Sequence, residues 1–492
     1  MVNFTRYIFH RKQLFTRPQN ALSISIYSFM VVLLSGCATG NHIVAKQRVL
    51  NLDQMNVGTD FTARQTQHSN DHMAWWTTWQ DPQLNRLMQL IDGNPPSLEI
   101  AQARFDRALA LLDLSQTNRQ VQGGVSAAAT ADRYPDHSTY PDTYAGKTGS
   151  SGNLLLSLSW HLDFWGKWKA LNQANASNID AAEFAIQDAQ LSLHTAIASN
   201  YLQWYMTNEL VNNQRRHISI LKRLVELTKQ KRNAGLATNS MVIQAQLNLL
   251  TQQKALPELQ RKVHLYRHTI ATLLGQPPSY ADNWSAPQLR LKPELKVITP
   301  LPLNWIGQRP DIQLKRKNLE AMLSMTEVAR ASFYPDIDLT AVVGLQSLGL
   351  DYLFRAGSRT AAIGPAINLP IFEQNRLRAE LKSKVADYDE AIAQYNQNLL
   401  IAIQQTTDHL QQLNTATQQR VLSVQSANAS SELRNIQREL LKKGLSTQQD
   451  ELLAELNQLE KAVDLIQINQ QMTMTQIELT HSLGGYWAFS TK

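Results

Sequence analysis

Two long stretches without proline constrain the fold of this 492-residue chain more than any other feature of its sequence. Proline is absent from residues 142–256 and 371–492, although the chain has 17 prolines. In the second stretch apolar residues recur in alternating steps of four and three, at Leu452, Leu456, Leu459, Val463 and Ile466. This spacing is typical of helices that pack side by side as in a coiled coil. If residues 166–235 and 374–443 are each one continuous helix, each is about 105 Å long, so it must pack against similar rods in this chain or in others.

The sequence contains one internal repeat. Ala170, Gly235 and Gly275 each have a counterpart 209 residues later, at Ala379, Gly444 and Gly484. Six of the 17 prolines fall between the copies, which is typical of a connector. We expect a first repeat over 82–276, a Pro-rich connector over 277–303, a second repeat over 304–486 and a C-terminal tail over 487–492. The expected long helices are, in order, 166–235, 238–275, 374–443 and 446–484.

Each repeat also contains a predicted β-hairpin, over about 122–164 and 335–371. Apolar and polar residues alternate in 154–163 and in 335–343, which indicates strands with one apolar face. Strands of about ten residues suit an outer membrane. Four strands alone would leave unpaired backbone groups in hydrocarbon, which is not tolerated. Other copies of the chain must then complete the sheet, and three copies would supply twelve strands. The alternative is a soluble antiparallel sheet with one wet face.

The N-terminal residues are those of an export leader. Residues 1–20 are basic without an acidic residue, and 21–34 form an apolar run too short for a comfortable membrane span. The following Leu34-Ser-Gly-Cys37 resembles the lipobox of bacterial lipoproteins, in which the signal peptide is cut before the cysteine. We therefore expect a signal peptide over 1–36, a lipid on Cys37 and a lipidated N-terminal segment over 37–81. The alternative is an ordinary secretory signal with a chance cysteine.

Several classes of function are disfavoured by composition and motifs. Four cations lie in the leader, so the formal net charge of +7 falls close to neutral without it, and no nucleic-acid partner is expected. His264 and His268 lack the glutamate that a zinc protease needs after the first histidine. No Walker-type Gly-rich loop ending in Lys-Ser or Lys-Thr occurs, so the chain should not bind ATP. We expect no enzyme activity, no metal site and no cofactor apart from the lipid on Cys37.

The sequence also resembles a known family. The resemblance depends on short motifs that occur in order along the mature chain: Trp75-Trp76 with Trp79 and Asp81-Pro82, Trp160-His-Leu-Asp-Phe-Trp-Gly166, Arg309-Pro-Asp-Ile312, Ala329-Arg-Ala-Ser-Phe-Tyr-Pro335 and Leu369-Pro-Ile-Phe372. With the internal repeat, they make the sequence similar to the outer membrane factors of the TolC/OprM type, in the NodT-like lipoprotein branch.

The resemblance implies a mainly α fold with a membrane β-barrel. Each protomer would give four β-strands and long coiled-coil-like helices, and a homotrimer would form a 12-stranded β-barrel continued by a 12-helix periplasmic α-barrel. Such a protein is a passive exit duct for drugs and toxic compounds in the outer membrane of a Gram-negative bacterium. It docks on a periplasmic adaptor and an inner-membrane transporter of the RND, MFS or ABC class. The alternatives are the duct of a type I protein secretion system and a non-conducting lipoprotein tether that spans the envelope.

The resemblance also places candidate functional residues at the two predicted helix turns. The expected adaptor-docking tips are Gly235, Leu236, Ala237, Thr238, Gly444, Leu445, Ser446 and Thr447. The expected periplasmic gate is Asp450, which would form a ring of three carboxylates, with Leu453 as an apolar collar and Met241 at the corresponding place in the first repeat. Glycine suits the positive φ that the end of a helix needs. The alternative is that the turns are plain helix caps and that Asp450 is an acid stabilised by the helix dipole.

Overall fold

The computed structural model describes residues 43–52, 59–62, 74–93, 95–137, 142–143, 145–292 and 296–490. The chain divides into two compact units, each of which is described separately below. The first consists of Met1–Lys46, Thr117–Leu171 and Ser324–Asp387, and the second of Gln47–Gln116, Asn172–Leu323 and Tyr388–Lys492. The predicted signal peptide and lipidation site, Cys37, lie outside the described residues.

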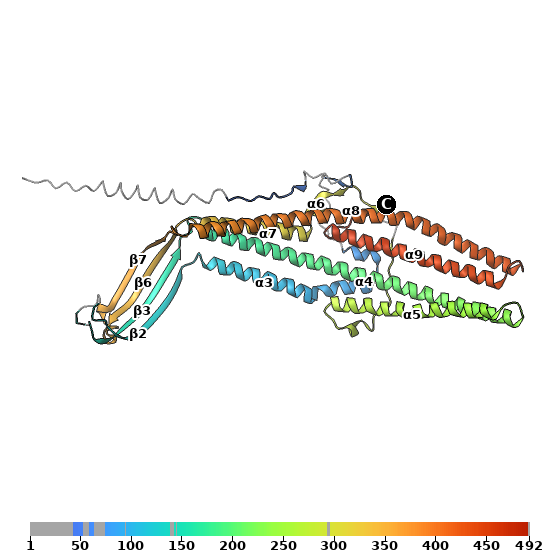
Figure 1. The fold of residues 1–492 in the computed structure, drawn as a ribbon, viewed down its shortest axis with the longest axis horizontal. Coiled ribbons are helices and arrows are strands. Elements are labelled where there is room, and N and C mark those ends of the chain that lie inside the picture. Colours follow the sequence, from blue (N-terminus) through green and yellow to red (C-terminus); the bar gives the residue numbers. More distant parts are fainter. Residues whose placement is uncertain are drawn as a thin grey trace, which may run out of the picture. The chain divides into compact units, whose positions relative to one another are not determined.

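The first unit contains one antiparallel four-stranded sheet (Figure 1). Its strands are β2 (Gln122–Arg133), β3 (Thr148–His161), β6 (Asp336–Leu348) and β7 (Arg359–Asn368). Their order is β2-β3-β6-β7, so the two predicted hairpins are joined through β3 and β6. Strand β3 begins six residues before the alternating segment and ends at His161. Asp163 therefore lies beyond the strand, where its carboxylate accepts hydrogen bonds from the backbone N–H groups of Trp168 and Lys169 at the start of the next helix.

The two faces of this sheet differ in chemistry because side chains alternate along every strand. Residues directly opposite each other share a face, and the register pairs Leu154 with Ala127 and Leu345, and Leu156 with Val125 and Val343. This apolar face extends to Ile363, which is opposite Ala341. Leu155 and Val342 also lie on the other face, but it carries mainly small and polar residues: Ser126, Ala128, Thr130, Asn153, Ser157, Thr340, Gly364 and Ala366. Many of the apolar side chains are exposed in a single chain.

The second unit contains most of four long helices. They are α4 (Lys167–Asn233), α5 (Asn239–Leu273), α8 (Gln374–Lys442) and α9 (Gln448–Ser482), and Figure 1 shows each long helix reversing into a shorter one. The seam expected from the sequence packs inward, since Leu452 and Leu456 are buried against Ile220 and Leu221 of α4. Helix α5 continues through Pro257, which can supply no N–H to the helix. Within the described part of the chain, no helix is both long and apolar enough to cross a lipid bilayer.

The remaining elements are shorter than the four long helices. In chain order they are β1 (Phe61–Thr62), η3 (Trp75–Trp79), α2 (Pro82–Gln89), η4 (Leu90–Gly93), α3 (Pro96–Thr117), η5 (Pro278–Ala281), β4 (Lys296–Val297), β5 (Leu301–Pro302), α6 (Leu303–Gly307), α7 (Pro310–Ala331), η6 (Leu350–Tyr352), η7 (Ala356–Ser358) and β8 (Phe489–Ser490). They belong to the second unit, apart from the ends of α3 and α7 and the two turns η6 and η7, which belong to the first unit. The C-terminal residues expected to be a plain tail thus include a strand, β8, which pairs with β4 of the connector.

A buried hydrogen-bond network connects the N-terminal part of the second unit to α4. Asp81 caps α2 by accepting hydrogen bonds from the backbone N–H groups of Gln83 and Leu84. The hydroxyl of Tyr201 donates to the same carboxylate over 3.0 Å, and the N–H of Gln288 donates over 2.8 Å. Burial of the ring raises the pKa of Tyr201, and the negative charge of Asp81 raises it further. Tyr201 therefore stays protonated and keeps this donor.

A second polar centre lies at the start of α7. Arg309 is buried and makes a two-pronged ion pair with Asp311, with both N–O distances close to 3 Å. Its Nη1 also donates to the backbone oxygen of Ser482, the last residue of α9. The following Gly484 has φ +74°, and a Cβ there would lie 3.2 Å from the Cα of Arg309. Glycine thus lets the end of α9 approach Arg309 closely.

Candidate functional site

The two predicted helix turns have the same backbone geometry. Gly235 has φ +74° and Gly444 has φ +75°. In the first turn the N–H of Leu236 donates to Lys231 O over 2.8 Å and that of Gly235 to Arg232 O over 2.9 Å. In the second turn the N–H of Leu445 donates to Leu440 O over 2.9 Å, and that of Gly444 to Leu441 O over 3.0 Å. This is the Schellman pattern, which requires a left-handed residue after the last helical turn.

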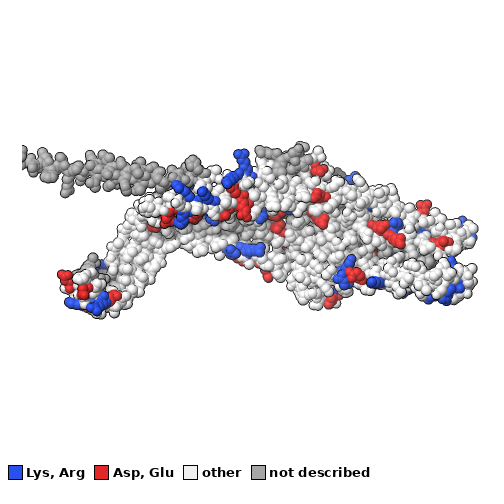
Figure 2. Space-filling model, viewed as in Figure 1, with Lys and Arg blue, Asp and Glu red and all other residues white. Residues whose placement is uncertain are grey.

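The residues after the two glycines are exposed. Leu236 is 78% exposed and Leu445 is 72% exposed, so neither leucine packs against its own chain. Both turns are preceded by cations: Lys229, Lys231, Arg232, Arg438, Lys442 and Lys443. In Figure 2, Lys and Arg side chains are visible at the end of the second unit where the long helices turn. The turns therefore present an apolar side chain among positive charges.

Asp450 caps the start of α9. Its backbone N–H donates to Oγ1 of Thr447, and its Oδ2 accepts from the N–H of Thr447 over 3.0 Å, which completes a capping box. The Thr447 hydroxyl also lies 2.5 Å from Oδ2. These hydrogen bonds with Thr447 lower the pKa of Asp450, and the charge of Lys231 lowers it further. Asp450 is therefore an exposed, ionised carboxylate held in a fixed position.

The first repeat has no capping box at the corresponding place. Thr238 precedes α5 as Thr447 precedes α9, but its side chain makes no capping hydrogen bond. Instead its hydroxyl lies 2.8 Å from that of Ser240. Met241 occupies the position of Asp450 and is exposed. The two turns thus share a backbone and differ in charge.

The residues that follow Asp450 divide between the two sides of α9. Leu452 is buried, whereas the next residue, Leu453, is about half exposed. Glu455 lies 3.9 Å from Arg223 of α4 and 3.8 Å from Arg434 of α8. Helix α9 is therefore attached to both neighbouring helices just beyond its first turn, and Leu453 faces away from this packing.

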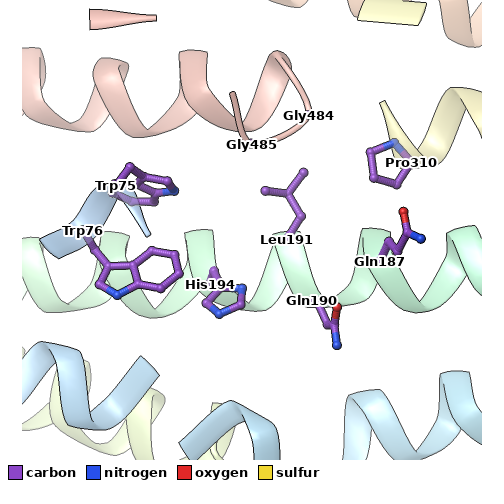
Figure 3. Close-up of a pocket in the computed structure, with 9 residues that line it drawn as sticks. All are labelled: Trp75, Trp76, Gln187, Gln190, Leu191, His194, Pro310, Gly484 and Gly485. Carbon is purple, nitrogen blue, oxygen red and sulfur yellow. The ribbon is translucent and has the colours of Figure 1, made fainter. Parts of the chain in front are cut away.

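A cavity of about 370 Å³ lies elsewhere in the second unit (Figure 3). Its lining includes Trp76 and His194, whose rings stack at 4.6 Å, and Gln187, Gln190 and Gly485. Burial lowers the pKa of His194, so the imidazole is neutral near pH 7. Sequence reasoning did not find this cavity. The Trp75-Trp76 pair is a motif of the family and does not by itself predict a cavity.

The described residues contain no group of three or more His, Cys, Asp or Glu side chains that could hold a metal ion. His264 and His268 have their ring centres 6.2 Å apart on α5. Each unit has its own candidate surface: in the second unit the two turns with the first residues of α5 and α9, and in the first unit the apolar face of the sheet. Such surfaces can contact other molecules and can border a path for solutes.

Comparison with known structures defines the class of protein. Solved outer membrane channels share this arrangement of long helix pairs and a small sheet. The outer membrane protein VceC of Vibrio cholerae superposes on the chain with a TM-score of 0.77 at 30% identity, over 84% of this chain and 98% of VceC. The fold is that of an outer membrane channel.

Sequence comparison then gives the family. The sequence model of the outer membrane efflux proteins matches residues 87–276 and 301–485, and the chain belongs to this family. The chain is 28% identical to the fusaric acid resistance protein FusA of Burkholderia cepacia, over 71% of this chain and 67% of FusA. It is 25% identical to the multidrug resistance outer membrane protein MdtP of Escherichia coli, over 92% of this chain and 94% of MdtP.

Proposed function

We propose that three copies of this chain form one passive exit duct for small toxic compounds, as the outer membrane component of a tripartite efflux system. The duct makes and breaks no covalent bonds. Its work is to provide a water-filled path and to open and close that path. Energy and substrate selection then come from an inner-membrane transporter of the RND, MFS or ABC class.

The unfinished sheet is the observation that carries this proposal. Among the described strands, β2 and β7 are edges with no partner on their outer sides. The apolar face suits hydrocarbon, where unpaired backbone groups cost several kcal/mol each. Four antiparallel strands leave β2 and β7 running in opposite directions, so β7 of one copy can pair with β2 of the next. Such a head-to-tail contact closes into a ring.

The number of copies follows from the width of the path. Two copies would supply eight strands, and the interior of a barrel of about eight strands is filled by side chains. Three copies would supply twelve strands, which leaves room for a lumen. The small residues of the polar face, such as Ser126, Ala128 and Gly364, would line it.

Exposed apolar side chains on the helices support association of copies. Ile243, Leu247 and Leu250 follow one another at helical spacing on α5 and are each about half exposed. Leu422, Leu433 and Ile436 of α8 are exposed as well. In a single copy these side chains would be exposed to water, whereas a ring of twelve helices would bury them.

The helix turns would provide docking and closure. Leu236 and Leu445 with their cationic neighbours would contact a periplasmic adaptor through an apolar and acidic surface. Three Asp450 carboxylates would form a ring at the entrance that attracts cations, with Leu453 and Met241 as its apolar surroundings. A lipid on Cys37 would anchor each copy in the outer membrane, since acyl chains add to the affinity for a bilayer.

The names of two relatives support efflux of small compounds. FusA is named for fusaric acid resistance and MdtP for multidrug resistance. Deletion of the gene, followed by susceptibility tests against a panel of drugs, is therefore expected to lower resistance. A defect restricted to the secretion of one polypeptide would instead identify a type I secretion duct.

The decisive experiment uses the purified, lipidated full chain. Native mass spectrometry in mild detergent is expected to give a trimer, and planar bilayers with the same sample are expected to show single-channel currents. A monomer without current would contradict the proposal. A trimer that carries no current at any voltage or pH would indicate a structural tether and not a duct.

A further inference from the structure

The loop between β6 and β7 forms a compact, hydrogen-bonded patch. The Ser358 hydroxyl donates to Tyr352 O over 2.7 Å, and the N–H of Arg355 donates to the same carbonyl over 3.0 Å. The N–H of Leu350 donates to the Ser150 hydroxyl of β3 over 3.0 Å, which ties the loop to the sheet. These bonds fix the backbone of the loop before any ligand binds.

This loop lies over one end of the apolar face. Leu350 and Leu353 cover Gly152, since a Cβ on Gly152 would lie 2.7 Å and 3.2 Å from their Cδ2 atoms. Gly152 shares its face with Leu154 and Leu156, because residues two apart on a strand point the same way. Arg359 is on this face too, directly opposite Leu345.

The patch combines free cations with exposed rings. The guanidinium of Arg355 lies 4.4 Å from the ring centre of Tyr352, and Phe354 is 78% exposed. Within the described part of the chain, no carboxylate lies within ion-pair distance of Arg355 or Arg359. Asp351 is the only acidic residue between 345 and 361. Asp132, on β2, lies on the opposite, polar face and accepts hydrogen bonds from the Thr130 and Ser151 hydroxyls.

We infer that Leu350–Arg359 binds the phosphorylated headgroups of anionic lipids at the membrane surface. The inference rests on the proposed function, in which the apolar face of the sheet meets lipid. Arg355 and Arg359 would each contact phosphate oxygens, for which a guanidinium has two parallel N–H donors. Tyr352 and Phe354 would enter the interfacial layer beside the headgroup, where aromatic rings are favoured.

The test uses the full-length trimer in vesicles of phosphatidylcholine, with or without the diphosphorylated glycolipid lipid A. Native mass spectrometry after extraction counts the lipid A molecules that each trimer retains. The variant Arg355→Gln/Arg359→Gln is expected to bind lipid A more weakly, by about five-fold for each arginine removed. The difference in lipid A binding between the wild type and this variant should become smaller as the salt concentration is raised, since the arginines are exposed. The variant Arg355→Lys/Arg359→Lys should recover part of the binding.

Three comparisons keep the outcome unambiguous. Arg104→Gln on α3 removes an exposed cation elsewhere and should retain lipid A like the wild type. If the double glutamine variant does not fold, each single variant should show half of the effect on a logarithmic scale. Unchanged lipid A retention in the glutamine variants would overturn the inference. So would equal displacement of lipid A by inorganic phosphate at the same phosphate concentration, because the patch would then be a simple anion site.

The proposed function is tested separately on the same samples. Trimer mass and single-channel current in phosphatidylcholine should be the same for the wild type and the glutamine variants. Loss of lipid A retention with normal current supports the lipid patch. Loss of current in the wild type itself would instead contradict the duct.

Discussion

Lys231, in the last turn of α4, donates a hydrogen bond from Nζ to Oε1 of Gln449, in the first turn of α9, over 2.6 Å. This contact joins the two helix turns of one chain across 218 residues of sequence. Because each turn carries an exposed leucine, the bond holds the two proposed docking surfaces in a fixed position relative to each other. It also places a cation near Asp450.

Lys231→Met should loosen both turns. Loss of one hydrogen bond removes about 0.5–1.5 kcal/mol, so amide exchange at 234–238 and 445–450 is expected to speed up by roughly two- to ten-fold. Hydrogen exchange with mass spectrometry measures this. Lys229→Met is the matched control, since Lys229 lies 4.0 Å from Glu226 of its own helix and should leave exchange unchanged. Equal exchange in wild type and Lys231→Met would show that the bond does not hold the turns together.

Asp450→Asn separates the charge at the proposed gate from the helix cap. The amide oxygen can still accept from the Thr447 N–H, but the ring of three charges is lost. Channel current should rise and block by multivalent cations should weaken, as measured in planar bilayers. Met241→Asp makes the opposite change at the corresponding place in the first repeat and should strengthen block. Unchanged block in both variants would reject a carboxylate ring at the entrance.

Thr447→Val should change the pH dependence of cation block. Hydrogen bonds with Thr447 lower the pKa of Asp450, so its charge persists as the pH falls below the ordinary value of about 3.9. Removal of the hydroxyl should raise this pKa, and block should then disappear at a higher pH. Thr447→Ser keeps the hydroxyl and should behave as the wild type does. A shift to lower pH in Thr447→Val would contradict the assignment.

Tyr201→Phe should destabilise the second unit. The change removes one of four hydrogen bonds to the buried Asp81 carboxylate, at a cost of about 1.5–3 kcal/mol. The midpoint of thermal unfolding should fall. Because the pKa of Tyr201 is raised in the fold, its contribution is fully present below the unfolded value of about 10 and is lost at higher pH. The difference in unfolding midpoint between the variant and the wild type should therefore become smaller above that pH. Tyr205→Phe is the control one turn further along α4.

The long helices could be predicted because their signals repeat many times. The seam that begins with Leu452 and Leu456 recurs at five positions of α9 up to Ile466, and the structure buries both leucines. The four helices begin and end within two residues of their expected bounds. Glycines at φ near +74° terminate all four, at Gly235, Gly275, Gly444 and Gly484. Such endings are local in sequence, which is why they could be found without a structure.

The details of the sheet and of the capped turn could not be predicted as well. Strand β3 begins with Thr148-Gly-Ser-Ser-Gly-Asn, which has no apolar alternation. Pairing with β2, and from Ser151 onward also with β6, makes this segment a strand. The sequence also could not decide whether Asp450 is a gate residue or a helix cap, because the answer depends on the geometry of the turn. The structure shows the capping box, while the ring of carboxylates involves other copies and stays a prediction. The Arg355–Tyr352 contact likewise joins residues whose relation depends on the loop conformation.

The antiparallel pairing of β2 with β3 and of β6 with β7 has a consequence for biogenesis. Each hairpin returns the backbone to the side from which it came, so only the connections 134–147 and 349–358 need to be translocated through the lipid. Every long helix can therefore finish folding on the side where export delivers the polypeptide. Insertion then requires the passage of two short loops per copy, whatever the length of the helices.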